Sequence, residues 1–316
     1  MAEMGSVVRA ESLAAFCVRA FERMGVTAEE ARTTADVLVQ ANLRGIDSHG
    51  VARLRRYVNG LRDGVMVARP QEKVLIETPT TVTIDAGAGL GQPVSHRAMT
   101  MAIQKAREVG CGFATVRNSN HFGIAGYYAM MALEHEMIGI SLTNSQPLVA
   151  PTYGRTAVLG TNPISIAAPA GHELPYVLDM ATSIVPIGKI TVSQKAGEKI
   201  PLGWGIDAAG QLTSDPKAVL EGGALLPLGG TDVMRGYKGY GLALMVDILA
   251  GVLAGAAFGL NVGHPKDPRP ANVGHFFAAL KIEAFRPLEE FKEDMDRLVR
   301  MLKKAPKLPG HDRIYI

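Results

Sequence analysis

The chain is long enough for a large core, and its composition excludes several classes of protein. It has 316 residues, of which 47% are hydrophobic, so we expect one large core or two smaller ones. Charged residues make up 20% and the formal net charge is only +3, so nucleic acid is not the expected partner. The 8 histidines are scattered and Cys17 lies far from Cys111, so no metal site is expected.

The expected compartment is the cytoplasm. Residues 1–5 lack the basic start, apolar stretch and cleavage site of a signal peptide, and both cysteines are typical of buried thiols in a reducing compartment. Residues 239–260 form a stretch of about 22 residues with one charge, Asp247, which is long enough to raise the question of a membrane span. The stretch is rich in Gly and Ala and lacks anchoring residues at its C-terminal edge, so we interpret it as a buried helix and expect no membrane partner.

The first 75 residues predict a helical unit. Apolar residues with helical spacing end before Gly25, and a capping-box pattern of Thr27 and Glu30 begins a second helix over 28–43. A third helix carries Leu54, Tyr57, Val58 and Leu61. We expect the C-terminal helix, within 286–316, to join this unit.

Residues 76–285 predict an α/β region that binds cofactor and substrate. Strand-like runs, turn signals and helical periodicity alternate along this part of the chain. Residues 195–232 are rich in Gly, Pro, Asp and Lys and predict an elaborated loop region. The expected strands are 81–84, 113–116, 138–142, 164–167, 176–178 and 275–280, and the expected helices are 93–109, 124–136 and 239–260.

A glycine-rich turn, Gly87–Gln92, stands between a predicted strand and a predicted helix, where a dinucleotide fingerprint would lie. Its sixth position is Gln92 instead of glycine, so the close helix packing of that fingerprint is not provided. We interpret the segment mainly as a turn and leave phosphate contact as the alternative.

The segment Asp47–Gly50 carries the stronger functional signal. It lies at the predicted start of the third helix, where free backbone N–H groups favour an anion. Steps of four from His49 reach Arg53 and Tyr57, so an arginine fork could hold a carboxylate while a histidine reaches the adjacent oxygen. In the alternative interpretation Ser48 is only an N-cap, and His49 and Arg53 are solvated. A hydrolytic triad is disfavoured, because consecutive residues do not easily form its linear relay.

Polar segments follow three predicted strands. Ligands in α/β proteins commonly bind beyond the carboxyl ends of strands, so these segments indicate one shared crevice, although a polar loop would look the same. Lys238, flanked by glycines before a helix, is a further candidate anion ligand or a surface turn. The three segments are Arg117–His121, Thr143–Ser145 and Asp179–Ser183.

With these segments in place, the sequence resembles the malate/L-lactate dehydrogenase family, which includes ureidoglycolate and sulfolactate dehydrogenases and the piperideine-2-carboxylate reductases. The matching blocks occur in the expected order over most of the chain. They are Arg44–Arg53, Asn118–Gly123, Gly160–Pro163, Leu178–Ser183 and Lys238–Gly241.

The resemblance implies a homodimer with a mixed sheet and a non-Rossmann nicotinamide-binding domain, using NAD or NADP. In one branch Ser48 and His49 match a proton relay and donor, with Arg53 on the substrate carboxylate; in another branch the acid/base role matches His121. Tyr57 and Thr143 are expected to assist substrate binding. The positions expected at the cofactor are His121, Phe122, Gly123, Ile124, Ala125, Ser145, Asp179, Met180, Ala181, Lys238, Leu308, Pro309, Gly310, His311 and Arg313.

The expected function is hydride transfer between the nicotinamide and a small 2-hydroxy or 2-oxo acid, such as malate, lactate, sulfolactate or ureidoglycolate. One alternative is reduction of a cyclic imino acid such as piperideine-2-carboxylate with NADPH, and a remoter one is a non-catalytic anion-binding protein. The run Ile184–Lys189 departs from the family pattern, so no contacts are transferred to it, and residues 261–272 are short for the family.

Overall fold

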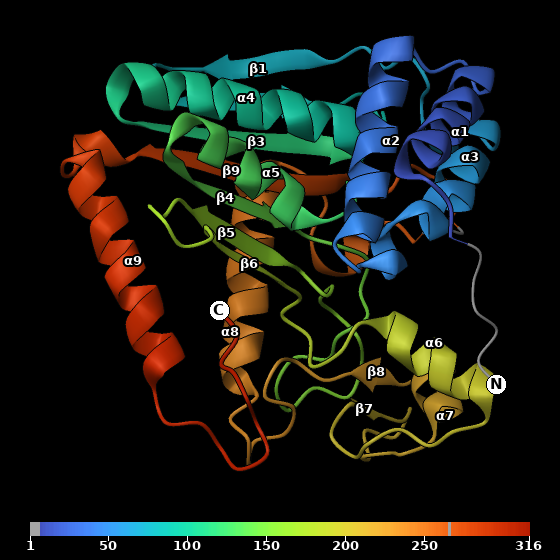
Figure 1. Ribbon diagram of the computed structural model, residues 1–316. Coiled ribbons are helices and arrows are strands. Elements are labelled where there is room, and N and C mark those ends of the chain that lie inside the picture. The colour runs from blue at the N-terminus through green and yellow to red at the C-terminus, as the bar shows by residue number, and fades with distance from the viewer. Residues whose placement is uncertain (1–6, 265–266) are drawn as a thin grey trace.

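A computed structural model describes residues 7–264 and 267–316, and its centre is a sheet of seven strands (Figure 1). The sheet has the order β1-β2-β3-β9-β4-β5-β6. The strands are β1 (Lys73–Glu77), β2 (Thr81–Asp85), β3 (Cys111–Ser119), β4 (Met137–Thr143), β5 (Ile164–Ala168), β6 (Tyr176–Met180) and β9 (Val273–Lys281).

The sheet is mixed, as the family resemblance implies. Only β2 and β3 pair in parallel, and the other five pairings are antiparallel. A doubly wound Rossmann sheet is mostly parallel, so this architecture differs from it. The predicted strand boundaries are close to those observed, whereas β1 was not predicted and crosses the expected domain boundary at residue 75.

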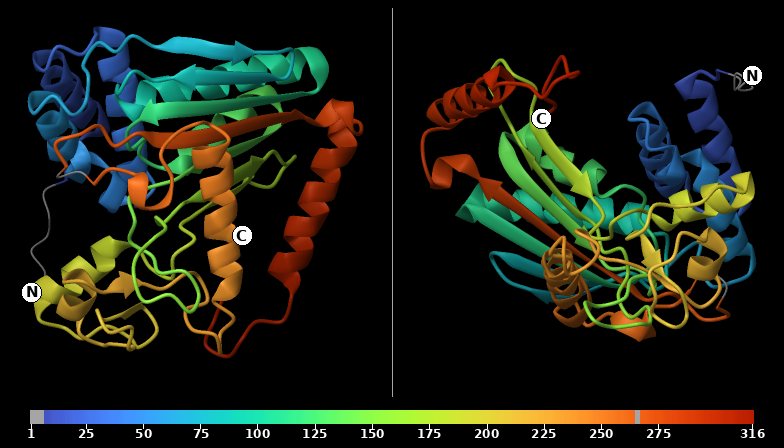
Figure 2. Two further views of the ribbon diagram at one scale, coloured as in Figure 1. Left: turned by 180° about the vertical axis from the view of Figure 1, so that it is seen from behind. Right: turned by 90° about the horizontal axis from the view of Figure 1, so that it is seen from below.

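Helices cover both faces of the sheet (Figures 1 and 2). The helices α4 (Gly91–Val109) and α5 (Ala125–Met131) pack on one face through a large core that includes Met99, Tyr128 and Phe277. On the other face lies α8 (Tyr237–Val246), which continues as a π-helical segment, Asp247–Val252. There Val246 and Ala250 pack against Leu142.

The helical unit contains α1 (Ala10–Arg23), α2 (Ala28–Leu43) and α3 (Leu54–Arg62). The Thr27 hydroxyl accepts from the Glu30 N–H at 3.3 Å, which confirms the predicted cap. Between α2 and α3, however, the chain forms two 3₁₀ turns, Asp47–His49 and Val51–Arg53, so the prediction that the third helix begins at Asp47–Gly50 and carries His49, Arg53 and Tyr57 at steps of four is wrong.

The side chain of Asn42 gives the physical reason for this break. Its Oδ1 accepts from the Val51 N–H at 2.8 Å, and its Nδ2 donates to the Asp47 carboxylate. Gly50 between the two turns is extended, and a Cβ atom there would lie 2.2 Å from Asn42 Oδ1. The Asn42 side chain therefore accepts the Val51 N–H, which a continuous helix would have bonded to a carbonyl of its own backbone.

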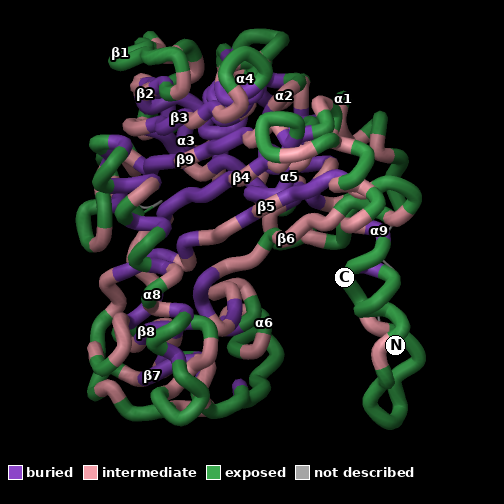
Figure 3. Tube along the Cα trace, turned by 90° about the vertical axis from the view of Figure 1, so that its left-hand side faces the viewer, coloured by how far each residue is buried: buried purple, intermediate pink, exposed green. Residues whose placement is uncertain are grey.

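The predicted loop region of residues 195–232 contains regular structure. It includes α7 (Pro216–Leu220) and the hairpin strands β7 (Gly205–Ile206) and β8 (Ala224–Leu225), and α6 (Ile187–Ala196) precedes it. These elements form a small lobe with its own core, to which Ile190, Val219 and Leu225 contribute (Figure 3). The interpretation as loop alone is therefore wrong.

The C-terminal helix α9 (Leu288–Lys304) lies at the far end of the sheet from α1–α3, so the expectation that it joins the helical unit is wrong (Figure 1). Asp296 on α9 accepts three backbone N–H groups, from Gly171, His172 and Glu173, at 2.8–3.0 Å. A carboxylate with three such donors fixes the helix to the β5–β6 connection.

The apolar stretch 239–260 is only partly buried. Asp247 is buried, and its carboxylate accepts from Asn144 Nδ2 at 3.0 Å and from the Gly259 N–H at 2.9 Å. The opposite side of the helix exposes Ile248, Val252 and Leu253 to between 49% and 60%, so the prediction of a buried helix holds for one face only. Among the described residues, no helix has the length and apolarity needed to cross a membrane.

Candidate active site

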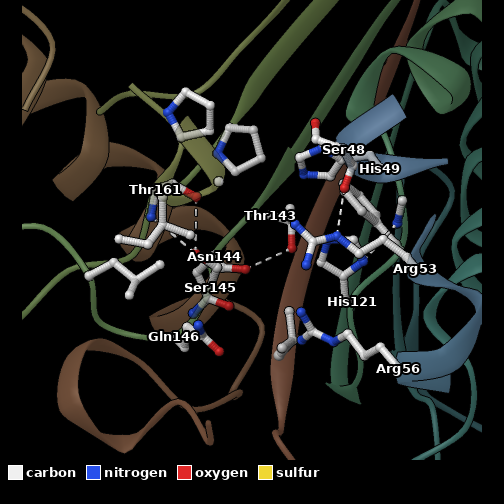
Figure 4. A pocket seen from close by; sticks show the side chains of 18 of the residues that line it. Ser48, His49, Arg53, Arg56, His121, Thr143, Asn144, Ser145, Gln146 and Thr161 are labelled. Carbon is white, nitrogen blue, oxygen red and sulfur yellow. Dashed lines mark hydrogen bonds between the residues drawn. The ribbon is translucent and has the colours of Figure 1, made fainter. Parts of the chain in front are cut away.

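A cavity of about 130 Å³ lies between the α2–α3 connection and the ends of β3 and β4 (Figure 4). Segments that are far apart in the sequence line it. They include residues from two of the three polar segments that follow predicted strands, Arg117–His121 and Thr143–Ser145. Its walls include Ser48, His49, Arg53, Arg56, His121, Thr143, Asn144, Ser145, Gln146 and Thr161.

His121 follows β3 and has its ring fixed from one side. Its Nδ1 lies 2.6 Å from the hydroxyl of Tyr57 and 3.3 Å from the Gly123 N–H. A backbone N–H can only donate, so the Gly123 contact favours the tautomer with its proton on Nε2, whereas the tautomer with its proton on Nδ1 would donate to the Tyr57 hydroxyl. The Tyr57 hydroxyl can donate to the neutral ring or accept from a protonated ring, so it stays paired in both charge states.

His49 stacks on His121, with ring centroids 5.5 Å apart and an interplanar angle of 21°. Its Nδ1 lies 2.9 Å from the hydroxyl of Ser48, so the expected Ser48–His49 pair is present. Ser48 is exposed whereas His49 is half-buried, and this pair therefore connects the cavity wall to solvent. His49 and His121, the two alternatives for the acid/base role, are therefore neighbours in one site.

Desolvation lowers the pKa of both histidines. Burial, followed by the positive charges of Arg53 and Arg56, lowers the pKa of His49 to about 4. Burial, followed by the charge of Arg56 and further nearby groups, lowers the pKa of His121 well below 6.5. Both rings are thus neutral at pH 7 in the free protein, which suits a general base.

Two arginines line the cavity. The Nε of Arg53 donates to the carbonyl of Ser48 at 2.6 Å, which fixes the side chain and leaves its outer N–H groups for a ligand. Arg56 also lines the cavity, and its Nε is buried without a partner among the described residues. Two guanidinium groups with free donors could hold an anion in this cavity.

The wall opposite the arginines begins at the end of β4. The Thr143 hydroxyl lies 2.7 Å from Nδ1 of His275 and 3.0 Å from the Gly274 carbonyl, and His275 Nε2 lies 2.8 Å from the Ser119 hydroxyl. His275 is fully buried, and desolvation lowers its pKa to about 3. A neutral ring paired at both nitrogens fixes the orientation of Thr143.

Several predicted site residues lie elsewhere. Tyr57 is fully buried behind His121, so the structure gives it a supporting position behind the ring and no place on the cavity wall. Phe122 and Gly123 do line the cavity. The others do not: Ile124, Ala125, Asp179, Met180, Ala181, Lys238, Leu308, Pro309, Gly310, His311 and Arg313.

Two of these outlying groups have clear surroundings. Asp179 accepts from the Gly126 N–H at 2.7 Å at the start of α5, and desolvation of the carboxyl group raises the pKa of Asp179 to about 6 although the residue as a whole is exposed. Lys238 is exposed in the first turn of α8. The segment 308–313 is exposed beyond α9.

Sequence reasoning missed Arg56, Gln146 and the segment Pro186–Gly188, all of which line the cavity. Arg56 could have been found, because it is three residues after Arg53 on the same turn-and-helix segment. Gln146 directly follows Thr143–Ser145, a polar segment that the sequence analysis placed at the site. The segment Pro186–Gly188 lies at the cavity because the small lobe packs beside the end of the sheet. No local sequence pattern indicates that position.

The glycine-rich turn has a packing role. Gly87 and Ala88 have φ values of 58° and 59°, and a Cβ atom on Gly91 would lie 2.2 Å from the Asn120 carbonyl oxygen. Gln92 is buried on the first turn of α4. None of these residues lines the cavity, which supports the interpretation as a turn.

The cavity also fits the reacting end of a nicotinamide cofactor. The Oε1 of Gln146 is buried on its wall with no donor among the described residues. A nicotinamide carboxamide carries the N–H donors that such an oxygen needs, and the nearby Ser145 and Thr161 side chains are uncharged. Among the described residues there is no metal-binding cluster of His, Cys, Asp or Glu.

Comparison with known proteins identifies the family of the chain. Residues 8–316 match the sequence model described as malate/L-lactate dehydrogenase. Malate dehydrogenase from Pyrococcus abyssi is 50% identical over 307 residues, or 97% of this chain and 84% of that protein. L-sulfolactate dehydrogenase from Methanocaldococcus jannaschii is 40% identical over 307 residues, or 97% of this chain and 87% of that protein. A solved structure of malate dehydrogenase from Pyrococcus horikoshii OT3 has a TM-score of 0.90 and 47% identity, covering 100% of this chain and 89% of that one.

Neutral histidines beside free guanidinium groups, in a cavity of a mixed α/β fold, define an enzyme site for a small acid. The matches over nearly the whole chain make the assignment specific: the protein belongs to the malate/L-lactate dehydrogenase family. It is therefore an oxidoreductase, which decides against the alternative of a non-catalytic anion-binding protein.

Proposed function

We propose that this cavity transfers hydride between a nicotinamide cofactor and a small 2-hydroxy or 2-oxo acid. The single observation that carries the proposal is the placement of His121 and Arg53 on one wall, where a ring can reach the substrate oxygen while a guanidinium binds the adjacent carboxylate. A bound nicotinamide accepts or supplies the hydride at the substrate carbon. The protein binds, orients and moves the proton.

Within this proposal His121 is the acid/base. Its ring is held by more contacts than the ring of His49, because Tyr57 and Gly123 both contact Nδ1 of His121. When a hydroxy acid is oxidised, the neutral ring carries its proton on Nδ1 and donates it to the Tyr57 hydroxyl, so the free Nε2 takes the substrate hydroxyl proton and the ring becomes an imidazolium. In reduction the proton returns from Nε2 to the substrate oxygen. Ser48 and His49 would then form the route between the ring pair and solvent.

The test is a cofactor titration followed by a substrate panel. NADH and NADPH are each assayed with oxaloacetate, pyruvate, 3-sulfopyruvate and the cyclic imino acid piperideine-2-carboxylate. Oxidation of a reduced cofactor by one or more 2-oxo acids supports the proposal. Activity confined to the imino acid would replace it by the reductase alternative, and no activity with any compound would contradict both.

The pH profile provides a further prediction. Because the pKa values of His49 and His121 lie below 6.5, kcat/KM for hydroxy-acid oxidation should stay level as the pH falls through 6.5 and decrease only at lower pH. Removing a nearby positive charge makes protonation easier and raises a histidine pKa, so Arg56→Gln should move this acid limb to higher pH. A limb at 6.5 in both proteins would contradict the electrostatic account.

We further propose a homodimer in the cytoplasm. The exposed side of α8 and its π-helical continuation carries Leu244, Met245, Ile248, Val252 and Leu253, and a second copy of the chain would cover this apolar surface. The buried thiol of Cys17 suits a reducing compartment. Light scattering during gel filtration should give twice the mass of the chain, and Ile248→Glu should give the monomer mass.

A further inference from the structure

Asp247 is a buried carboxylate that lies directly behind the cavity wall. Its Oδ1 accepts from Nδ2 of Asn144 at 3.0 Å, and Asn144 lines the cavity. Its Oδ2 accepts from the Gly259 N–H at 2.9 Å. Asp247 is only 5% exposed, and the proton transfer at His121 does not involve it. A buried acidic group one hydrogen bond away from the cavity therefore has no assigned role.

The π-helical segment Asp247–Val252 brings the carboxylate to this place. Asn144 is fixed on its other sides, because its Nδ2 also donates to the Ala257 carbonyl at 2.7 Å and its Oδ1 accepts from the Gly274 N–H at 2.9 Å. A Cβ atom on Gly251 would lie 2.9 Å from Asn144 Nδ2, so glycine permits the close approach of the two segments. π-helical turns are frequent at functional sites. The carboxylate is thus held in one position behind Asn144.

The hydrogen bonds of Asp247 favour its ionised form. Because Oδ1 of Asn144 already accepts from Gly274, the amide group of Asn144 must donate to Asp247, and Gly259 contributes a second N–H donor. Burial raises the pKa of Asp247, and these two hydrogen bonds lower it. No cation in the described part of the chain is among the groups that shift this pKa. The negative charge is therefore buried without a neighbouring positive charge.

Opposite charges thus lie on the two sides of the cavity. Arg53 and Arg56 are on one side, and Figure 4 shows Asn144, Ser145 and Gln146 on the other. The second side carries the buried Gln146 Oε1 that suits a nicotinamide carboxamide. The oxidised nicotinamide ring has one positive charge, whereas the reduced ring is neutral. A negative charge behind this side attracts the oxidised ring and offsets its repulsion from the two guanidinium groups.

We propose that Asp247 is the counter-charge of the oxidised nicotinamide ring and, from behind Asn144, stabilises the oxidised cofactor in the site relative to the reduced cofactor. Asp247 acts across Asn144 and touches neither cofactor nor substrate, so it is a positioning residue. This inference rests on the proposed function, because it requires a nicotinamide on the Gln146 side of the cavity.

The test measures cofactor binding without turnover. Calorimetry gives the Kd of NAD⁺, NADH, NADP⁺ and NADPH for the native protein and for Asp247→Asn, with no substrate present, and the pair that the native protein binds more tightly is compared. Asp247→Asn keeps the size of the side chain and removes its charge. The Kd of the oxidised cofactor should rise by on the order of 10-fold, while that of the reduced cofactor changes by less than about twofold.

The ratio of the two dissociation constants separates charge from packing. A displaced Asn144 or a partly unfolded variant weakens both forms of the cofactor alike and leaves the ratio unchanged. Asp247→Glu disturbs the packing but keeps the charge, so it should retain the native ratio even if its Tm falls. Glu108→Gln removes a carboxylate from an exposed position on α4, away from the cavity, and should leave both constants at their native values.

Different outcomes contradict different statements. An equal rise of both constants in Asp247→Asn would overturn the electrostatic role, because that pattern indicates a structural effect, and two unchanged constants would overturn it as well. Loss of the native ratio in Asp247→Glu would exclude charge as its cause. A native protein that binds none of the four cofactors contradicts the proposed function itself.

Discussion

Replacing His121 by glutamine is expected to lower kcat/KM for both directions of the reaction by roughly 10³–10⁴-fold, with a smaller effect on KM. Glutamine keeps a polar side chain but cannot carry the proton that must leave or reach the substrate oxygen. The same substitution at His49 should cost less, about 10-fold, if that ring only connects the site to solvent. Steady-state kinetics with saturating cofactor measures both effects.

His172→Gln is the matched control, because His172 is exposed on the β5–β6 connection and does not line the cavity. It should retain native activity. If His49→Gln has the large effect and His121→Gln the small one, the acid/base role belongs to His49, and the Ser48 hydroxyl then becomes its partner. Equal small effects for both would mean that neither ring transfers the proton.

Replacing Arg53 by glutamine is expected to lower kcat/KM by roughly 10²–10³-fold for every acid in the panel, whatever group the substrate carries at its far end. The carboxylate next to the reacting carbon is common to all of them, and it loses its bidentate partner. Kinetics on oxaloacetate and pyruvate measures the loss for each acid.

Arg53→Lys is a second variant worth comparing. It keeps the charge but loses the planar fork and the Nε donor to the Ser48 carbonyl, so it should recover only part of the activity. Arg55→Gln, which removes the same charge from an exposed residue, provides the control on the same segment. An Arg53→Gln enzyme with native kcat/KM for all acids would remove Arg53 from the carboxylate site.

The sequence predicted most secondary structure because the signals are local. The cap of α2 depends on residues three apart, and the strands of the mixed sheet are marked by short apolar runs. Two of the polar strand exits, with His121 and Thr143, line the cavity as expected. The family was recognisable for the same reason, since its motifs are short blocks whose order along the chain can be read directly.

Tertiary contacts decided the rest. Tyr57 pairs with His121 across 64 residues, and Asn144 with Asp247 across 103, so neither partnership follows from spacing along a helix. The position of α9 depends on contacts far away in the sequence, among them the buried carboxylate of Asp296, which meets three backbone donors, and the pairs of Arg300 and Lys303 with Glu173.

The segment Asp47–Gly50 illustrates both what the sequence determined and what only the tertiary structure decided. Its residue types alone indicated a site for a carboxylate and a proton, and the family motif agreed. Only the folded chain shows that the Asn42 side chain separates this turn from the next one, Val51–Arg53, that His49 stacks on His121, and that Arg56 reaches the same cavity without an anion. Burial of the uncompensated charge is a property of the assembled cavity, and no stretch of sequence encodes it locally.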